Sequence, residues 1–390
     1  MSTADPAPLA CPACGAEYVD RWRCTCGHPL EFARQPLPDG PAPDPASFDT
    51  REGLWSFQAF LPVEQQVSLG EGMTPLEDAP AWDAQFKLEY VFPTGSFKDR
   101  GATATLSRAV ELGVDRVVED SSGNAGAAIA TYAARAGIDA EIYVPASVKQ
   151  SKLRAIEAAG ATPVRVEGSR QDVTDACVEA AVSEDKGSTG DGQPGEDKGS
   201  TGGGQPGDDG ASGAWYASHA WNPAFFAGTA TVAYETALQR DWEVPDAVVT
   251  PLGHGTLFLG AYRGFRALKA AGWTDSIPRM YGAQAAGYAP IAAELHGTDE
   301  GTNDVADGIQ IRDPVQKDAI LAAIEETGGD AIALGEEPVA DELQRLHGAG
   351  FYTEPTCAVA PAALRAYRER GEIHPDEDVV VPLTGSGLKT

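Results

Sequence analysis

The stretch RVVEDSSGNAGAAIATYAARAG, Arg116 to Gly137, predicts a strand, a glycine loop and an alanine-rich helix in direct succession. Val117 and Val118 are the apolar centre of the strand, and the helix should run over about 125–135. Gly137 should end it, because glycine readily adopts the left-handed conformation that closes a helix. A strand that passes through a short loop into a helix is the repeating unit of an α/β fold.

The same alternation continues along the chain. A helix is predicted over 149–159, ended by Gly160. Short apolar runs predict further strands at 140–144, 164–166, 247–250 and 379–383. We therefore expect an α/β protein with two domains. Its binding site should lie in the cleft between them, because ligands of such sheets gather at the carboxyl ends of the strands.

The charge balance indicates the surroundings of the protein. Its 390 residues carry 58 acidic and 29 basic side chains, a formal net charge of -29. This charge disfavours nucleic acid and membrane surfaces as partners and is typical of a halophilic protein, although an ordinary acidic protein is the alternative. We see no long apolar run and no basic, apolar leader. We therefore expect a cytoplasmic protein with a small-molecule ligand.

Two low-complexity segments interrupt the pattern. Residues 35–50 are rich in proline, aspartate and alanine, which predicts a linker. The sequence EDKGSTGDGQPG at 184–195 recurs with a single substitution as EDKGSTGGGQPG at 196–207. Because this tandem repeat has no apolar side chain to bury, we predict that residues 184–213 form a disordered surface insertion.

Four cysteines near the start of the chain form two pairs, Cys11-Pro-Ala-Cys14-Gly and Cys24-Thr-Cys26-Gly. Each pair lies in a turn that ends in glycine, so two thiolates from one turn can face the same ion. The spacing predicts one tetrahedral zinc site with all four as ligands. His28 is an alternative ligand, and disulfide pairing is the other interpretation, which a cytoplasmic location disfavours.

The segment FPTGSFKDRG, 92–101, places Lys98 in the first turn of a predicted helix that Ser96 can cap. The helix dipole and the neighbouring Arg100 should both lower the pKa of Lys98. A deprotonated amine is the form that attacks a carbonyl to give an imine. Taken alone, this feature also fits an ordinary solvated lysine.

Two glycine loops each follow a predicted strand and open a predicted helix. DSSGNAG, 120–126, offers backbone N–H groups and hydroxyls that suit a carboxylate, and TPLGHGTL, 250–257, offers a cradle that suits a phosphate. The C-terminal LTGSGLKT, 383–390, lacks the Gly-Lys-Ser/Thr order of a nucleotide loop, and no G-x-G-x-x-G opens a dinucleotide unit. Without Lys98, each loop is equally well interpreted as a structural turn.

In this order, the motifs PTGSFKDRGA, SSGNAG, GHGTL and TGSGLK resemble those of the fold-type-II pyridoxal-phosphate enzymes, and most closely those of threonine synthases. GEGMTPLE at 70–77 and the cysteine pairs also look like threonine synthases. The resemblance implies a zinc-ribbon-like module at 1–33, a linker and lead-in at 34–67, and a catalytic core of two tryptophan synthase β-like subdomains at 68–390. It also implies a homodimer, although no stretch of the sequence identifies an interface.

The resemblance implies a role for each motif residue. Lys98 would hold pyridoxal phosphate as a Schiff base and then shuttle protons, while Asn124 bonds the phenolic oxygen and Thr384 the pyridine nitrogen. Ser121 and Ser122, with the following amides from Asn124 on, would bind the substrate carboxylate. The cofactor phosphate would be held by the main-chain amides of Gly253, His254, Gly255, Thr256 and Leu257.

One stretch departs from the family. Threonine synthases, which make threonine and phosphate from O-phospho-L-homoserine and water, carry an arginine shortly after an Asn-Pro pair and then a lysine, and this arginine helps to hold the substrate phosphate. Here Asn222-Pro223 is followed by Phe225 and Ala230 at those two positions. Loss of a guanidinium removes strong bidentate contacts to a phosphate. Candidates to compensate are His219, Lys152 and Arg154.

Three functions therefore stay open on the sequence. A threonine synthase fits the cysteine pairs and the ordered motifs. A related pyridoxal-phosphate lyase, such as a threonine or serine dehydratase, or a β-replacement enzyme, fits Phe225 and Ala230. A binding protein that retains the cofactor without catalysis is the third, and intact Lys98, Asn124 and Thr384 argue against it.

Overall fold

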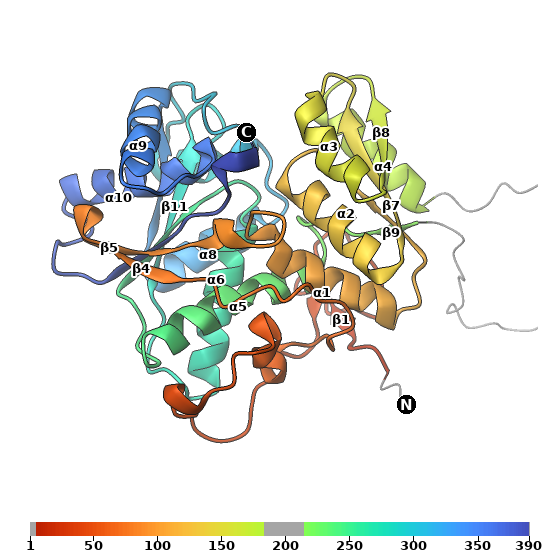
Figure 1. The fold of residues 1–390 in the computed structure, drawn as a ribbon, viewed down its shortest axis with the longest axis horizontal. Helices are drawn as coiled ribbons and strands as arrows, with labels where there is room; N and C mark the ends of the chain where they lie inside the picture. The colour runs from red at the N-terminus through yellow and green to blue at the C-terminus, as the bar shows by residue number, and fades with distance from the viewer. Residues whose placement is uncertain (1–4, 183–213, 390) are drawn as a thin grey trace, which may run out of the picture.

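The computed structural model describes residues 5–182 and 214–389, so the insertion predicted at 184–213 lies outside the described residues. Figure 1 shows two units side by side, each built around a mainly parallel sheet, with a small N-terminal module near α1. The chain enters the larger unit, crosses to the smaller one after β5, and returns through α5. All predicted strands and helices of the α/β pattern are present within a few residues of the expected bounds.

The larger unit has a six-stranded sheet in the order β12-β11-β10-β13-β5-β4, parallel except for the β4–β5 pair. Its strands are β4 (Leu76–Ala79), β5 (Ala84–Lys87), β10 (Ala247–Pro251), β11 (Arg279–Ala285), β12 (Asp330–Leu334) and β13 (Val379–Pro382). Successive strand residues point to opposite faces, so Val248 packs in one core cluster and Val249 in the other. Helices cover both faces, which explains why these strands are apolar throughout.

One face is packed by α5 (Pro223–Gln239), α6 (Thr256–Ala270) and α8 (Lys317–Thr327). The other is packed by α9 (Glu336–Gly348) and α10 (Val359–Glu369), and α7 (Pro290–His296) lies beside β12. The short 3-10 helices are η1 (Pro45–Ser47), η2 (Gly53–Phe60), η3 (Pro80–Trp82), η4 (Glu89–Val91), η5 (Asp307–Ile309), η6 (Pro355–Ala358) and η7 (Gly387–Lys389). Of these, η2 packs the aromatic rings of Phe57 and Phe60 against α5.

The smaller unit has a parallel four-stranded sheet in the order β8-β7-β6-β9. The strands are β6 (Arg116–Glu119), β7 (Asp139–Pro145), β8 (Thr162–Val166) and β9 (Trp215–Tyr216). Its helices are α1 (Lys98–Glu111), α2 (Asn124–Ala136), α3 (Gln150–Ala158) and α4 (Arg170–Val182). The first three helices pack on one face of the sheet and α4 on the other.

The N-terminal module is a small antiparallel sheet of β1 (Leu9–Ala10), β2 (Glu17–Tyr18) and β3 (Glu31–Phe32). It is fastened to α1, because Arg108 donates hydrogen bonds of 2.8 Å to the carbonyl oxygens of Ala7 and Val19. Among the helices of residues 5–182 and 214–389, none is long and apolar enough to span a membrane.

Candidate active site

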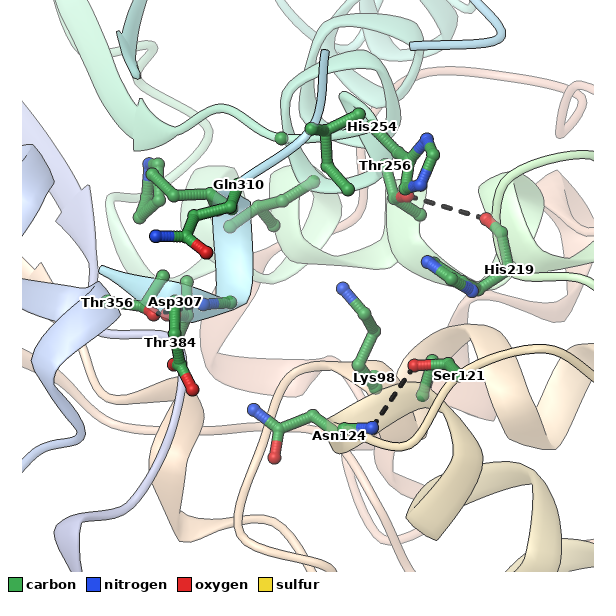
Figure 2. Close-up of a pocket in the computed structure, with 18 of the residues that line it drawn as sticks. Lys98, Ser121, Asn124, His219, His254, Thr256, Asp307, Gln310, Thr356 and Thr384 are labelled. Atoms are coloured by element: carbon green, nitrogen blue, oxygen red, sulfur yellow. Dashed lines mark hydrogen bonds between the residues drawn. The ribbon is translucent and has the colours of Figure 1, made fainter. Parts of the chain in front are cut away.

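A cavity of about 200 Å³ lies where the loops after β6, β10 and β13 meet the start of α1. Figure 2 shows Lys98 extending into this space, with His219 and His254 on one side and Asn124 and Thr384 on another. Four separate segments thus meet at one place. All the catalytic, cofactor and substrate residues predicted from the sequence line the cavity, namely Lys98, Ser121, Ser122, Asn124, Gly253, His254, Gly255, Thr256, Leu257 and Thr384.

Lys98 is the first residue of α1, and Phe97 rather than Ser96 is the N-cap. The Ser96 hydroxyl still accepts a hydrogen bond of 3.3 Å from the backbone N–H of Lys98. The amine lies 4.0 Å from the centroid of the Phe97 ring and has no hydrogen-bond partner among the described residues. Burial, aided by the charge of Lys389, lowers the pKa of Lys98 to about 8, although Glu354 and Glu119 act in the opposite direction.

The sequence prediction that Arg100 lowers the pKa of Lys98 is wrong. Arg100 is fully buried, and its guanidinium is paired with the carboxylates of Glu89 and Glu235, each at 2.6 Å. Lys87 adds a second cation at 2.9 Å from Glu235, so the cluster is electrically balanced. It fixes α1 to the larger unit directly behind Lys98, which gives Arg100 a positioning role that the sequence did not reveal.

The loop after β6 needs glycine for a steric reason. A Cβ at Gly126 would lie 1.8 Å from the carbonyl oxygen of Ser121, so only glycine lets the loop fold this closely onto the start of α2. Asn124 begins that helix and donates to both carboxylate oxygens of Glu354 at 3.0 Å. Burial raises the pKa of Glu354. If Asn124 bonds the cofactor as the resemblance implies, its side-chain amide must either leave Glu354 or donate to both partners.

The loop after β10 forms the second cradle. Gly255 is the N-cap of α6 with a φ of 82°, and a Cβ there would lie 2.5 Å from Ile320. Nδ1 of His254 is buried without a hydrogen-bond partner among the described residues, and burial keeps the pKa of this imidazole well below its usual range. The loop thus offers open backbone amides at a helix N-terminus together with an unsatisfied ring nitrogen, a combination suited to an anion.

A buried pair, Glu119 and His219, lies beside Lys98. Glu119 ends β6, and its carboxyl is 2.7 Å from Nδ1 of His219, while the His219 backbone N–H donates to the second oxygen. Burial and the charge of Asp120 raise the pKa of Glu119, and burial and the charge of Lys98 lower that of His219 to about 3. Both shifts favour a neutral pair in which Glu119 donates to Nδ1. The hydrogen of the imidazole then lies on Nε2.

The loop after β13 carries Thr384 against Cys357. The Cys357 sulfur is 3.2 Å from the Thr384 hydroxyl and accepts from the backbone N–H of Gly385 at 3.0 Å. A Cβ at Gly385 would collide with the carboxyl of Glu354 at 2.3 Å. Glu354 and Cys357 therefore hold the Thr384 loop. Neither residue lies in a motif that predicts this role; the only local signals are the neighbouring Pro355 and the apolar run that follows.

The two positions that depart from the family do not reach the cavity. Phe225 is fully buried, and a Cβ at Gly101 would lie 2.1 Å from its ring, so it packs flat against α1 behind His219. Ala230 lies where α5 crosses α6, since a Cβ at Gly264 would lie 2.4 Å from the Ala230 carbonyl oxygen. Both side chains serve helix packing.

Of the three candidates to replace the family arginine, His219 and Lys152 line the cavity, whereas Arg154 is not among its lining residues. Arg170, which the sequence reasoning missed, lines it as well. The Lys152 amine forms an ion pair of 3.0 Å with Asp307 of η5 in the larger unit. Only tertiary structure brings Lys152 and Asp307 together, because η5 lies 155 residues further along the chain.

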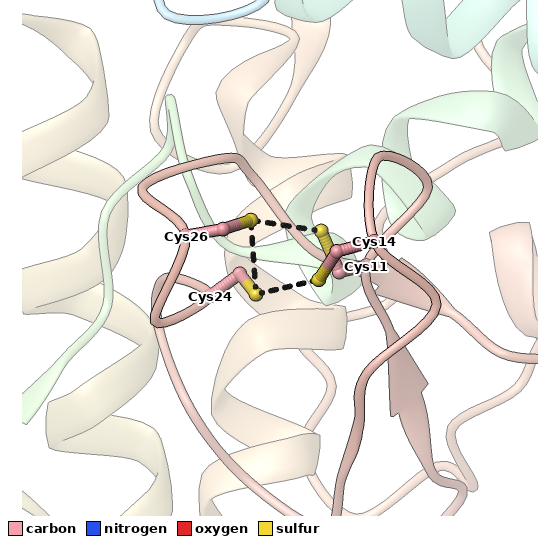
Figure 3. Close-up of side chains that lie close together, drawn as sticks. All are labelled: Cys11, Cys14, Cys24 and Cys26. Carbon is pink, nitrogen blue, oxygen red and sulfur yellow. Dashed lines mark hydrogen bonds between the residues drawn. The ribbon is translucent and has the colours of Figure 1, made fainter.

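The four predicted zinc ligands form a cluster in which all sulfur atoms lie within 4.8 Å of one another (Figure 3). Three of the contacts are 3.3 to 3.5 Å, far longer than a disulfide bond, and all four cysteines are free. Ligands at the usual zinc–sulfur distance in a tetrahedron lie about 3.8 Å apart. The cluster is compatible in size with that arrangement.

The residues of the cavity fit pyridoxal phosphate. The group needs an unpaired amine for its aldehyde and an anion cradle for its phosphate. Lys98 supplies an amine without a hydrogen-bond partner among the described residues, and the Gly253–Leu257 loop supplies open amides beside an unsatisfied His254.

Sequence comparisons with known proteins support this cofactor assignment. A family model described as "Pyridoxal-phosphate dependent enzyme" matches residues 67–385. The threonine synthase of Methanosarcina acetivorans is 34% identical over 86% of this chain and 80% of its own length. That of Methanocaldococcus jannaschii is 31% identical over 97% of this chain and 92% of its own length.

Solved structures share the fold. Threonine deaminase isoform 2 of Solanum lycopersicum has a TM-score of 0.63 at 21% identity, covering 80% of this chain and 79% of that chain. Maize serine racemase has a TM-score of 0.61 at 20% identity, covering 81% and 88%. At sequence identities of 20% and 21%, these likenesses support the fold alone. With the family match and the two curated relatives, the chain belongs to the pyridoxal-phosphate dependent enzymes, and within them to the threonine synthase family.

Proposed function

We propose that this protein is a lyase that converts O-phospho-L-homoserine and water to L-threonine and phosphate. The observation that carries the proposal is the meeting of Lys98, a carboxylate cradle and a phosphate cradle in one cavity. The name of the two relatives described above, threonine synthase, supports the same reaction. It requires protons to leave the α and β carbons, phosphate to leave the γ carbon, and water to add at the β carbon.

The residue roles are part of the proposal. Lys98 would bind the cofactor covalently, the Gly253–Leu257 amides would hold its phosphate, and Asn124 and Thr384 would contact its ring. Ser121 and Ser122 would hold the substrate carboxylate. When bound, pyridoxal phosphate supplies an electron sink for the carbon next to the substrate amine.

Lys98 is suited to moving protons at the α and β carbons. Because its pKa is lowered to about 8, a much larger fraction of the Lys98 amine is free near neutral pH than in an ordinary lysine, so this amine could both accept and return a proton. The buried Arg100 cluster keeps α1, and thus the amine, in a fixed position.

We also infer a structural zinc ion on Cys11, Cys14, Cys24 and Cys26, with 1–33 as its module, 34–67 as lead-in and 68–390 as the catalytic core. The size of the sulfur cluster supports the metal. The excess of acidic side chains supports purification and assay in concentrated potassium salt.

The test is to measure threonine and inorganic phosphate released from O-phospho-L-homoserine by protein loaded with pyridoxal phosphate in concentrated potassium salt. Equal amounts of both products are expected. Phe225 keeps a dehydratase as the second candidate. If neither product forms while the Schiff-base absorbance is intact, and free threonine or serine yields ammonia and a keto acid, the dehydratase replaces our proposal.

A further inference from the structure

A buried carboxyl and an imidazole lie beside Lys98, and the roles proposed above use neither. Glu119 ends β6 and is 0% exposed, while His219 is 6% exposed in the segment between β9 and α5. The Glu119 carboxyl lies 2.7 Å from Nδ1 of His219. His219 lines the cavity, whereas Glu119 is not among its lining residues. The imidazole therefore offers the hidden carboxyl a route to the cavity.

The position of the imidazole is fixed from several sides. The His219 backbone N–H donates to the second carboxyl oxygen of Glu119 at 3.3 Å, and the His219 carbonyl oxygen accepts from the Thr256 hydroxyl at 3.4 Å. The rings of Phe225 and His254 pack edge-on at 6.1 and 5.4 Å. Figure 2 shows the His219 ring turned towards the space that Lys98 enters. Nε2 makes no hydrogen bond with a described residue, so this nitrogen is left for a ligand.

The charges around the pair determine where its hydrogens lie. Burial and the charge of Asp120 raise the pKa of Glu119, against the opposing charges of Arg170 and Lys98. Burial, with the charges of Lys98 and Arg170, lowers the pKa of His219 to about 3. The carboxyl is thus protonated and donates to Nδ1, and Nε2 carries a hydrogen. An acid behind a neutral imidazole can pass a proton to the cavity without forming a buried imidazolium.

The proposed reaction needs two proton transfers beyond those given to Lys98. The γ carbon, which loses phosphate, must gain a proton to become a methyl group. The water that adds at the β carbon must lose a proton. These two transfers are equal and opposite, so one group that first gives and then takes a proton can serve both.

We propose that His219 is a second acid–base group of the cavity, with Glu119 as its proton store. In the first transfer the Nε2–H bond breaks and a C–H bond forms at the γ carbon, while the Glu119 hydrogen moves to Nδ1. In the second transfer the water oxygen bonds to the β carbon, its proton goes to Nε2, and the Nδ1 hydrogen returns to Glu119. The pair ends as it began. This inference rests on the proposed function for the identity of the reaction.

Electrons and protons balance in this scheme. Removal of the α and β protons leaves two electron pairs on the substrate; one departs with the phosphate, and the other forms the new C–H bond at the γ carbon. Of the two protons that Lys98 takes, one returns to the α carbon and the other leaves with the phosphate. The relay through His219 thus needs no further reactant.

The decisive variant is Glu119→Gln. Its side-chain amide still donates to Nδ1, which preserves the position of the ring and the hydrogen on Nε2, but an amide has no proton to pass on. The kcat for threonine formation should fall about a hundredfold or more, while KM and the Schiff-base absorbance stay at their wild-type values. Asp330→Asn is the matched control, because Asp330 pairs with His296 at 2.8 Å and neither residue lines the cavity, so its kcat should equal that of wild type. A wild-type kcat in Glu119→Gln would overturn the proposal.

Exchange of the α proton separates a relay from a general loss of structure. In D2O, the wild-type holoenzyme should exchange the α proton of L-2-aminobutyrate, which has no leaving group, because this step needs Lys98 and not His219. Glu119→Gln and His219→Gln should keep the wild-type exchange rate. A loss of exchange as large as the loss of threonine formation would show that the pair only shapes the cavity, and would overturn the proposal. A wild-type enzyme that exchanges this proton but forms no threonine would refute the proposed reaction itself, a failure seen without any variant.

The ¹⁵N NMR spectrum of the apoenzyme gives a readout without turnover. The His219 signals, assigned by their loss in His219→Gln, should show a neutral ring with its hydrogen on Nε2 between about pH 5 and 8, in wild type and in Glu119→Gln. A hydrogen on Nδ1 in the wild-type protein would mean that Nε2 has no proton to give, and would overturn the relay.

Discussion

Replacing Arg100 with methionine should destabilise the protein by about 3–5 kcal/mol, the usual effect of breaking a buried ion pair from one side. Arg100 makes charge-assisted hydrogen bonds of 2.6 to 2.8 Å to Glu89 and Glu235, and all three side chains are 0% exposed. Without it, two buried carboxylates face a single cation, Lys87. Methionine fills a similar volume, so the loss of charge dominates the effect.

The measurement is the free energy of unfolding from denaturant titration in potassium salt. Arg51→Met is the control, because Arg51 pairs with Asp49 at the surface, where the side chains are 85% and 56% exposed, and its loss should leave the free energy of unfolding nearly unchanged. Added salt should not reduce the Arg100 effect, since buried charges are poorly screened. An effect below about 1 kcal/mol for Arg100→Met would refute the view that this cluster anchors α1.

Three further predictions concern the cavity and the zinc module. Lys98→Ala should fold but lack Schiff-base absorbance, and a wild-type spectrum would contradict the assignment. In wild-type apoenzyme, the rate of pyridoxal-phosphate uptake should rise with pH up to about 8 and then level off, because the Lys98 amine is protonated below its pKa of about 8. A rate that keeps rising towards pH 10.5 would indicate an ordinary lysine. Gly126→Ala should push Ser121 away from the start of α2 and raise the KM for the amino-acid substrate by about tenfold or more. Gly335→Ala should leave this KM unchanged, because nothing lies within 4 Å of the added methyl group. Cys24→Ser should lose bound zinc by elemental analysis while His28→Ala retains it; zinc retained in Cys24→Ser would argue against the four-cysteine site.

The parts of the site that lie next to one another in sequence could be predicted from sequence. Lys98 at a helix start and the two glycine loops are local signals, because strand, loop and helix are set by periodicity and by the few residues that tolerate tight turns. The structure shows the physical reason at Gly126 and Gly255, where a Cβ would collide with neighbouring atoms. The resemblance of the motif order implied that both loops line one site, the first for the substrate carboxylate and the second for the cofactor phosphate.

The contacts between distant segments could not be predicted from sequence. Glu354 meets Asn124 across 230 positions, and Glu119 meets His219 across 100, so no spacing rule links them. Arg100 is the opposite case. Because it lies two residues from Lys98 in sequence, it was expected to lower the pKa of that lysine. The fold instead turns its guanidinium to Glu235, which lies 135 residues away.

The N-terminal module is connected to the cavity through the segment that carries His219. Asp20 accepts a hydrogen bond of 2.9 Å from the Trp215 indole, and Trp22 packs edge-on against Tyr216 at 5.4 Å and Trp221 at 5.2 Å. These three aromatic residues flank His219 on both sides in sequence. If the cysteine cluster binds a metal that orders the module, the same metal would also fix the backbone of the segment that carries His219. Because the Gly253–Leu257 cradle belongs to the larger unit, loss of the module should disturb the binding of substrate more than that of the cofactor.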